Sequence, residues 1–318
     1  MKKKSNNFIF RVSGNSRIGS GHLFHSLALN NILLEKNDTS VFLLYNCDKF
    51  VEEALLEKKI PFKHETNLKN DIKELYKKNN KNILINDVLN TDKATIKIQK
   101  DFGYKVINIE DLGDGVFYAD AVINALYSEI DNLNNQYFGP DYTILRNEFE
   151  ETRGTFNYED NNFVLVSFGG VDPNHISEAV YHELIKTDLP FKIIEPPFRK
   201  LEINNNLILK KPVQISEEMS KARILVSSMG RTVFESASLG IPVVSIAQNT
   251  RETQHINQYI SYINYLGEFK DLKFTDVVNN LISIYNDTGT LNTQRKKLLS
   301  LVDFKGPQRI KKIIESIK

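Results

Sequence analysis

Short apolar runs alternate with helical patterns along the 318-residue chain, and this alternation limits the possible folds more than any other feature of the sequence. Several runs, such as 41–44 and 163–168, are continuously apolar. Continuously apolar strands are typical of parallel sheets that helices cover on both faces. The sequence therefore predicts an α/β fold built from βαβ units. We expect strands at 8–12, 41–45, 83–85, 106–109, 121–123, 163–168, 191–194, 207–209, 224–226 and 243–246.

A polar, acidic stretch at 148–162, with Gly154 in its middle, interrupts the alternation, which then starts again. We therefore expect a first domain at 1–150 and a second domain at 151–318 that includes the C-terminal helices. Each is expected to be a doubly wound, Rossmann-like domain, and ligands of such sheets bind beyond the carboxyl ends of the strands. Two such domains facing each other across a cleft would hold one shared site.

The composition excludes several classes of function. The 41 basic and 40 acidic residues leave a formal net charge of +1, which provides no electrostatic footprint for nucleic acid. No run approaches the length of a membrane span, and the apolar run 8–10 is too short for a signal peptide. The single cysteine, Cys47, excludes an internal disulfide, and the histidine spacings match no metal site. We expect a soluble, cytoplasmic protein without a metal or other cofactor.

A turn with two glycines, Gly19-Ser20-Gly21-His22, joins the first expected strand to the first expected helix. Glycines let the backbone approach a ligand, and the N–H groups at the helix start point at it. The helix dipole disfavours a charged imidazolium, so we expect His22 to stay neutral and to act as a base. His25, one helical turn later, is expected to have a packing or supporting role. The turn lacks the glycine and lysine patterns of dinucleotide sites and P-loops, so a simple tight turn is the structural alternative.

The expected strand at 83–85 leads into the polar residues Asn86 and Asp87, with Asn90 close behind. Helix capping alone explains an aspartate or asparagine at such a position. Asp87 at a strand end is equally suited to hydrogen-bond a sugar hydroxyl or to position a water molecule. Both interpretations stay open.

The second domain contains two further turns with ligand-binding chemistry. Gly169 and Gly170 follow the run 163–168 and allow close approach by a ligand or by the facing domain. The next residues, Asp172-Pro173-Asn174, predict a turn and a helix cap.

The other turn, Ser227-Ser228-Met229-Gly230, precedes a predicted helix at 232–239 and is suited to phosphate, because hydroxyls and free N–H groups all donate. Glu235 is placed to accept from a ribose diol, and Arg231 either pairs with phosphate or is solvated. Asn249 follows the strand at 243–246, and its amide suits sugar hydroxyl or acetamido groups. A polar loop with a threonine cap is the structural alternative for that loop.

Six groups of residues, in this order along the chain, also match the motifs of a known family. They are Arg11…Ile18-Gly19-x-Gly21-His22, Ile109-Glu110-Asp111, Asn124-Ala125-Leu126-Tyr127, Gly139-Pro140-x-Tyr142-x-x-Leu145-Arg146-x-Glu148-Phe149, Ser167-Phe168-Gly169-Gly170-x-Asp172-Pro173 and Ser228-Met229-Gly230-x-Thr232-x-x-Glu235-x-x-x-Leu239-Gly240-Ile241-Pro242. With these motifs, nearly the whole chain resembles the UDP-sugar hydrolases of pseudaminic acid synthesis (PseG) and the related spore coat polysaccharide proteins (SpsG).

The resemblance implies the GT-B fold of MurG-like glycosyltransferases. It also implies hydrolysis of a UDP-linked 2,4-diacetamido-2,4,6-trideoxy sugar by attack of water at the anomeric carbon, without a metal. His22 would activate the water. Ser228, Gly230, Thr232 and Glu235 would hold UDP, the Gly19–Gly21 turn would shape the pocket, and Asn249 would reach the sugar or the diphosphate. Together with the turns described above, the predicted substrate-binding residues are Arg11, Gly19, Gly21, Asp87, Gly169, Gly170 and Asn249.

The chain departs from the hydrolase pattern in two places. It has Asn86-Asp87-Val88-Leu89 where hydrolase members have Asp-His-Tyr or Asp-Ser-Tyr, and His25 where they have arginine. The predicted function is a nucleotide-sugar hydrolase for nonulosonic acid or surface polysaccharide synthesis. One alternative is a GT-B glycosyltransferase, which would need an acceptor to release UDP. The other is a non-catalytic nucleotide-sugar-binding protein. Expected pathway partners are a cytidylyltransferase or a sialic-acid-type synthase.

Overall fold

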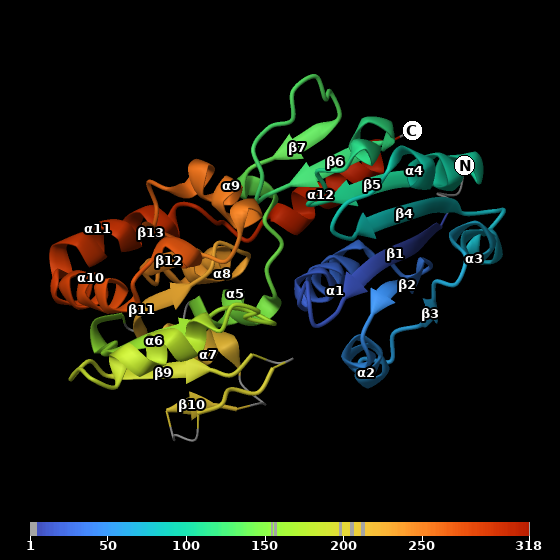
Figure 1. Ribbon diagram of the computed structural model, residues 1–318. Coiled ribbons are helices and arrows are strands. Elements are labelled where there is room, and N and C mark those ends of the chain that lie inside the picture. Colours follow the sequence, from blue (N-terminus) through green and yellow to red (C-terminus); the bar gives the residue numbers. More distant parts are fainter. Residues whose placement is uncertain are drawn as a thin grey trace. The chain divides into compact units, whose positions relative to one another are not determined.

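The computed structural model describes residues 5–153, 155, 158–196, 199–203, 207–210 and 214–317, without the side chains of 255–257. The chain forms two compact units (Figure 1). Unit 1 comprises Met1–Ile144 together with Lys305–Lys318, and unit 2 comprises Leu145–Phe304. Gly154, which the sequence placed in the middle of the domain boundary, lies outside the described residues.

Unit 1 is built on a parallel sheet. Its strands are β1 (Asn6–Gly14), β2 (Thr39–Cys47), β3 (Phe62–His64), β4 (Lys81–Asp87), β5 (Lys105–Ile109), β6 (Ala121–Asn124) and β7 (Gln136–Phe138). They lie in the order β3-β2-β1-β4-β5-β6-β7. The strand order reverses at β1, so the neighbouring exits of β1 and β4 form the topological switch point at which ligands of such sheets bind.

Helices cover both faces of this sheet. They are α1 (Gly21–Leu33), α2 (Lys49–Glu57), α3 (Leu68–Leu75), α4 (Lys93–Asp101) and α12 (Gly306–Ser316), with 3-10 turns at η1 (Asp114–Tyr118) and η2 (Pro140–Tyr142). Phe8 and Phe10 of β1 join a core with α1 and α12, whereas Ile9 joins a second core with α3 and α4. This alternation explains why β1 is apolar along most of its length.

Unit 2 repeats the plan with the strands β8 (Phe163–Ser167), β9 (Phe191–Ile194), β10 (Ile208–Leu209), β11 (Ala222–Ser227), β12 (Val243–Ala247) and β13 (Asn264–Glu268). They form a parallel sheet in the order β10-β9-β8-β11-β12-β13, with the switch point between β8 and β11. Its helices are α5 (Asn147–Arg153), α6 (Ile176–Leu184), α7 (Ile215–Ser220), α8 (Thr232–Leu239), α9 (Thr250–Tyr259), α10 (Phe274–Asn286) and α11 (Thr288–Leu299), with η3 (Tyr158–Asp160) and η4 (Phe269–Asp271). The predicted α/β class with two doubly wound parallel sheets is confirmed.

The last helix, α12, differs from the sequence prediction, which placed it in the second domain. Ile310, Ile313 and Ile314 of α12 pack in the core of unit 1. Lys81 Nζ donates to the carbonyl oxygens of Ile314 at 3.1 Å and Ile317 at 2.7 Å, which lie at the end of the helix. The amphipathic pattern of α12 shows that one face is apolar, but not which sheet that face covers.

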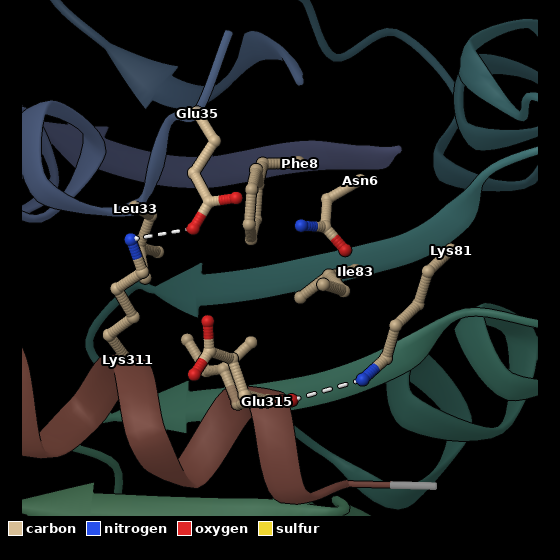
Figure 2. A pocket seen from close by; sticks show the side chains of 9 residues that line it. Asn6, Phe8, Leu33, Glu35, Lys81, Ile83, Lys311 and Glu315 are labelled. Carbon is tan, nitrogen blue, oxygen red and sulfur yellow. Dashed lines mark hydrogen bonds and ion pairs between the residues drawn. The ribbon is translucent and has the colours of Figure 1, made fainter. Parts of the chain in front are cut away.

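A second lysine attaches the same helix to α1. Lys311 Nζ lies 3.1 Å from Glu35 Oε1, on the far side of a small pocket between α12 and the sheet (Figure 2). Where the chain returns to unit 1, a Cβ atom on Gly306 would lie 2.1 Å from the carbonyl oxygen of Thr143, so that approach requires a glycine.

We expect Lys81→Met to lower the free energy of unfolding by about 1–2 kcal/mol, because the last carbonyl groups of α12 lose a charged donor. Urea unfolding followed by circular dichroism measures the change. Lys97→Met, which alters an exposed lysine on α4, is the matched control and is expected to leave stability unchanged. Equal stability of the two variants would contradict a stabilising role for Lys81.

Candidate functional site

The exits of β1 and β4 bring His22 and Asp87 together. His22 is the second residue of α1, and Asp87 is the last residue of β4. His22 Nδ1 lies 2.8 Å from Asp87 Oδ1, although the two residues are 65 positions apart in the sequence. This pair lies at the switch point of unit 1, where a doubly wound sheet places its ligand.

Two further side chains of α1 contact the same carboxylate. His25 Nδ1 lies 3.1 Å from Asp87 Oδ2, and Ser26 Oγ donates to that oxygen at 2.9 Å. His25 therefore has the supporting position that the sequence suggested. Ser26 was not recognised from the sequence, because a serine in a helix carries no signal for a partner on a distant strand.

The contacts around Asp87 determine which nitrogen of each imidazole carries hydrogen. Burial by itself raises the pKa of Asp87, but the charge of His25 and the hydrogen bonds of both histidines outweigh it and hold the pKa below its usual range. An ionised carboxylate only accepts hydrogen bonds, so Nδ1 of each ring donates. In a neutral His22, Nε2 then holds the lone pair that can accept a proton.

Asp87 itself does not have the position expected of a sugar-binding group. Its side chain is 0% exposed and accepts from three side chains. It is also not a helix cap, since Asp92 caps α4 by accepting from Thr95 N. Of the two interpretations left open, the structure supports neither in its simple form: the carboxylate orients histidines.

Arg11 also differs from its expected substrate-binding position. Its Nε and Nη2 form a two-pronged ion pair with the Glu65 carboxylate at 2.6 and 2.9 Å. The guanidinium carbon lies 4.1 Å from the centre of the Tyr45 ring. Both contacts are internal to unit 1, and the arginine is nearly fully buried, so these contacts support a structural role.

The glycine turn before α1 is ordered by Asn15. Its Oδ1 accepts from Arg17 N and Ile18 N, and its Nδ2 donates to the carbonyl oxygen of Asn46. Gly19 has φ +80°, a left-handed conformation that favours glycine, and its N–H donates to Asn15 O at 2.8 Å. Gly21 is the first residue of α1. The turn therefore holds the start of α1, and with it His22, in one place.

A buried polar network supports the exit of β4 from the opposite side. Asn86 and Gln99 exchange two amide hydrogen bonds of 2.9 Å, and Asn86 Nδ2 also donates to Asn108 Oδ1 at 3.0 Å. Asn108 continues the network to Thr91 and Asp111. Sequence reasoning did not identify Gln99 or Asn108; a polar residue within the apolar strand 106–109 was the available signal.

In unit 2, the exits of β8, β11 and β12 lie at the same sheet edge. Ser167, Ser227 and Ser245 are paired in register across these three strands. A Cβ atom on Gly169, whose φ is +76°, would have no neighbour within 4 Å, and one on Gly230 would meet only Ser228 Oγ at 4.0 Å. Space is therefore open beside both turns, and Gly170 follows directly in the first of them.

Glu252 of α9 organises the turn before α8. Its carboxylate accepts from Gln248 N at 2.8 Å and from the Ser228 hydroxyl and Met229 N–H. The Ser228 hydroxyl thus donates within the protein. Thr232 is the first residue of α8, where helix N–H groups lack internal acceptors, and Gly230 lies two residues before it. Those N–H groups are the natural donors for an anion. Glu252 was not singled out in the sequence.

Two residues of these loops accept hydrogen bonds from N–H groups at the start of helices. Asn249 Oδ1 accepts from Glu252 N at 3.0 Å at the start of α9. Asp172 lies three residues before the N-cap residue His175, and its carboxylate accepts from Ile176 N and Ser177 N, the first two N–H groups of α6. Asn174 Nδ2 donates to Gln248 O, which connects the β8 and β12 exits.

Glu235 lies in the first turn of α8 and forms an ion pair with Arg146. Arg146 Nη2 and Nε donate to Glu235 Oε1 at 2.8 and 3.2 Å. Its carboxylate keeps a side-chain exposure of 16%.

The described part of the chain contains no group of three or more histidine, cysteine, aspartate or glutamate side chains arranged to hold a metal ion. Within the same residues, no helix is both long enough and apolar enough to cross a membrane.

No protein-family model matches the chain. The chain is 28% identical to the uncharacterized protein MJ1062 of Methanocaldococcus jannaschii, over 86% of this chain and 66% of that protein, slightly less than two thirds of its length. It is 22% identical to the spore coat polysaccharide biosynthesis protein SpsG of Bacillus subtilis, over 74% of this chain and 76% of SpsG.

The solved structures that are similar to this chain share its fold. MurG of Acinetobacter baumannii superimposes with a TM-score of 0.67 at 13% identity, over 98% of this chain and 99% of MurG. HepE of Anabaena, solved with UDP-glucose, has a TM-score of 0.62 at 12% identity, over 98% of this chain and 99% of HepE. The chain is similar in sequence to SpsG and has the GT-B fold that these structures share. The predicted SpsG-like and MurG-like resemblance is thereby confirmed.

We expect the contribution of Glu252 to the free energy of unfolding to decrease as the pH rises. Burial raises the pKa of Glu252 above its usual 4.5, although the hydrogen bonds from Gln248, Ser228 and Met229 oppose the shift. Above pH 4.5 the folded state retains this proton longer than the unfolded chain does, so the unfolding free energy falls with rising pH.

Urea unfolding of the wild type and of Glu252→Gln between pH 4 and 7 measures this contribution. The stability of the wild type relative to the variant is expected to decrease as the pH rises. Glu202→Gln, at an exposed position of unit 2, is the control and is expected to parallel the wild type. If the difference in unfolding free energy between the wild type and Glu252→Gln does not change with pH, the raised pKa of Glu252 is contradicted.

Proposed function

We propose that this chain is a nucleotide-sugar hydrolase that releases UDP from an N-acetylated deoxy sugar, such as a 2,4-diacetamido-2,4,6-trideoxy sugar. The observation that carries the proposal is the hydrogen bond of 2.8 Å between His22 Nδ1 and the buried Asp87 carboxylate, because it leaves Nε2 of a neutral ring as a proton acceptor. An imidazole oriented by a carboxylate is a common arrangement for a general base.

The class of substrate is supported by unit 2 and by the relatives. The first turn of α8 offers N–H groups to a diphosphate, with open space beside Gly169 and Gly230. HepE was solved with UDP-glucose, and SpsG is named for polysaccharide biosynthesis. We therefore assign the nucleotide to Ser228, Gly230, Thr232 and Glu235. Substrate contacts are assigned to Gly19, Gly21, Gly169, Gly170 and Asn249.

In the proposed reaction, His22 Nε2 takes a proton from water while the water oxygen attacks the anomeric carbon. The bond between that carbon and the diphosphate oxygen breaks, and UDP departs with the electron pair. Asp87 stabilises the imidazolium that forms, and the N–H groups at the start of α8 stabilise the charge on the diphosphate. The products are UDP and the free sugar, for use in nonulosonic acid or surface polysaccharide synthesis.

The same residues also suit a second candidate, a glycosyltransferase that uses an acceptor hydroxyl in place of water. The fold favours this candidate as much as the first, since solved glycosyltransferases share it, one of them from Rickettsia africae with a TM-score of 0.58. A base at His22 can deprotonate either nucleophile.

One experiment separates the two candidates. The purified protein is incubated with a UDP-linked diacetamido-trideoxyhexose in ¹⁸O-labelled water, without acceptor, and followed by proton NMR and mass spectrometry. Hydrolysis as proposed yields UDP without label and a free sugar with ¹⁸O at its anomeric carbon. Label in UDP would mean attack at phosphorus and would contradict the mechanism. Release of UDP only when an acceptor is added would establish the transferase.

We expect His22→Asn to lower kcat by about 10²- to 10⁴-fold, because the proton acceptor is lost, while the Kd for UDP changes little. Asp87→Asn is expected to lower kcat by about 10²-fold or more, because an amide can donate to Nδ1 and favour the wrong tautomer. Initial rates of UDP release and calorimetric titration with UDP measure the two quantities.

The matched control is His64→Asn, which alters a half-exposed histidine of β3 that is paired with Glu52. This variant is expected to keep the kcat of the wild type. Full activity of His22→Asn would exclude His22 as the base. A large loss of UDP affinity with an unchanged kcat would assign it to binding instead.

A further inference from the structure

A partly buried cluster of three charged side chains lies beside the proposed nucleotide site. Arg146, just before α5, directs Nη2 and Nε to Glu235 Oε1 and places Nη1 3.1 Å from Glu148 Oε1. Its guanidinium carbon is 5.0 Å from the centre of the ring of Phe149, which is fully buried. One arginine therefore lies between two carboxylates from different helices.

Arg146 donates to only one of the two carboxylate oxygens of Glu235. Within the described part of the chain, both hydrogen bonds that the Glu235 carboxylate accepts end on Oε1. A carboxylate has about four acceptor positions on its two oxygens, so those of Oε2 remain for a ligand. The side chain is 16% exposed, and it lies in the same first helical turn as the N–H groups that we assign to the diphosphate.

The charges make this arrangement depend on Arg146. Burial lowers the pKa of Arg146, but the charges of Glu235 and Glu148 outweigh it and raise the pKa, so the guanidinium stays charged. Burial and the neighbouring Glu235 raise the pKa of Glu148, and Arg146 opposes that shift. Without Arg146, the carboxylates of Glu148 and Glu235 would lie in a partly buried site without the positive charge that now lies between them.

We infer that Arg146 is a positioning residue that holds the Glu235 carboxylate in one orientation, and that this makes the site select a ribose over a 2′-deoxyribose. The inference rests on the proposed function and deepens it. An oriented carboxylate can accept from both hydroxyls of a ribose. A 2′-deoxyribose removes one donor and leaves a desolvated acceptor without a partner, which costs affinity.

The test compares the affinities for UDP and 2′-deoxyuridine diphosphate by calorimetric titration. We expect the wild type to bind UDP about tenfold more tightly than the deoxy analogue. Arg146→Lys keeps the positive charge but loses the two-pronged geometry, and is expected to bring the ratio to within about threefold of unity. Because both constants are measured on one preparation, their ratio does not depend on the fraction of folded protein.

A double-variant comparison shows whether Arg146 acts through Glu235. Glu235→Ala, which removes the acceptor, is expected to reduce the ratio as Arg146→Lys does, and the combination of the two is expected to reduce it no further. Arg153→Lys is the matched control. Arg153 lies on α5, donates to the carbonyl groups of Leu299 and Val302, and is expected to leave the ratio at the wild-type value.

Three outcomes would overturn the inference, and they differ from one another. A wild type that binds neither nucleotide would overturn the proposed function together with the inference. A wild type that selects UDP while Arg146→Lys keeps the full ratio would overturn the role of Arg146 alone. Retention of the ratio by Glu235→Ala would show that Glu235 does not contact the ribose.

Discussion

The buried carboxylate of Asp87 is the group on which the arrangement of the unit 1 site depends. Its charge is removed from water, and the two imidazoles and the Ser26 hydroxyl compensate for that loss by hydrogen bonds. The same bonds determine the tautomer of His22. A requirement of folding and a requirement of the proposed chemistry are therefore met by one set of contacts, and loss of any partner affects both.

Carboxylates have a similar organising role at the other turns. Glu252 ties the β12 exit to the turn before α8, and Asp111 accepts from Thr91 and Asn108 beside the β4 exit. Beyond the end of a strand, backbone N–H groups lose their ladder partners, and buried side chains must replace them. Several positions that match the family motifs are therefore explained by loop architecture. Arg146 and Glu235 extend the pattern to the proposed nucleotide site.

How well the sequence predicts each element depends on burial. The core strands of both sheets were expected close to their observed positions, because each contains a short run of mainly apolar residues. The edge strands β3, β7 and β13 were not expected: β3 and β7 have three residues each, and β13 is only half-buried. The glycine turn, His22 and the residues before α8 were identified from local signals. Arg11 was assigned to substrate, but Glu65 binds it inside unit 1.

The sequence by itself determined the α/β class, the two parallel sheets, the SpsG-like resemblance and the chemical types available at each turn. All of these follow from local periodicity and from short motifs. Only the tertiary structure decided the partners: Asp87 with His22 and His25, Arg146 with Glu235, and α12 with unit 1. Parallel neighbours are joined by long crossovers, so strand exits that meet in space lie far apart in sequence, as the 65 positions between His22 and Asp87 show. Local patterns contain no record of that strand order.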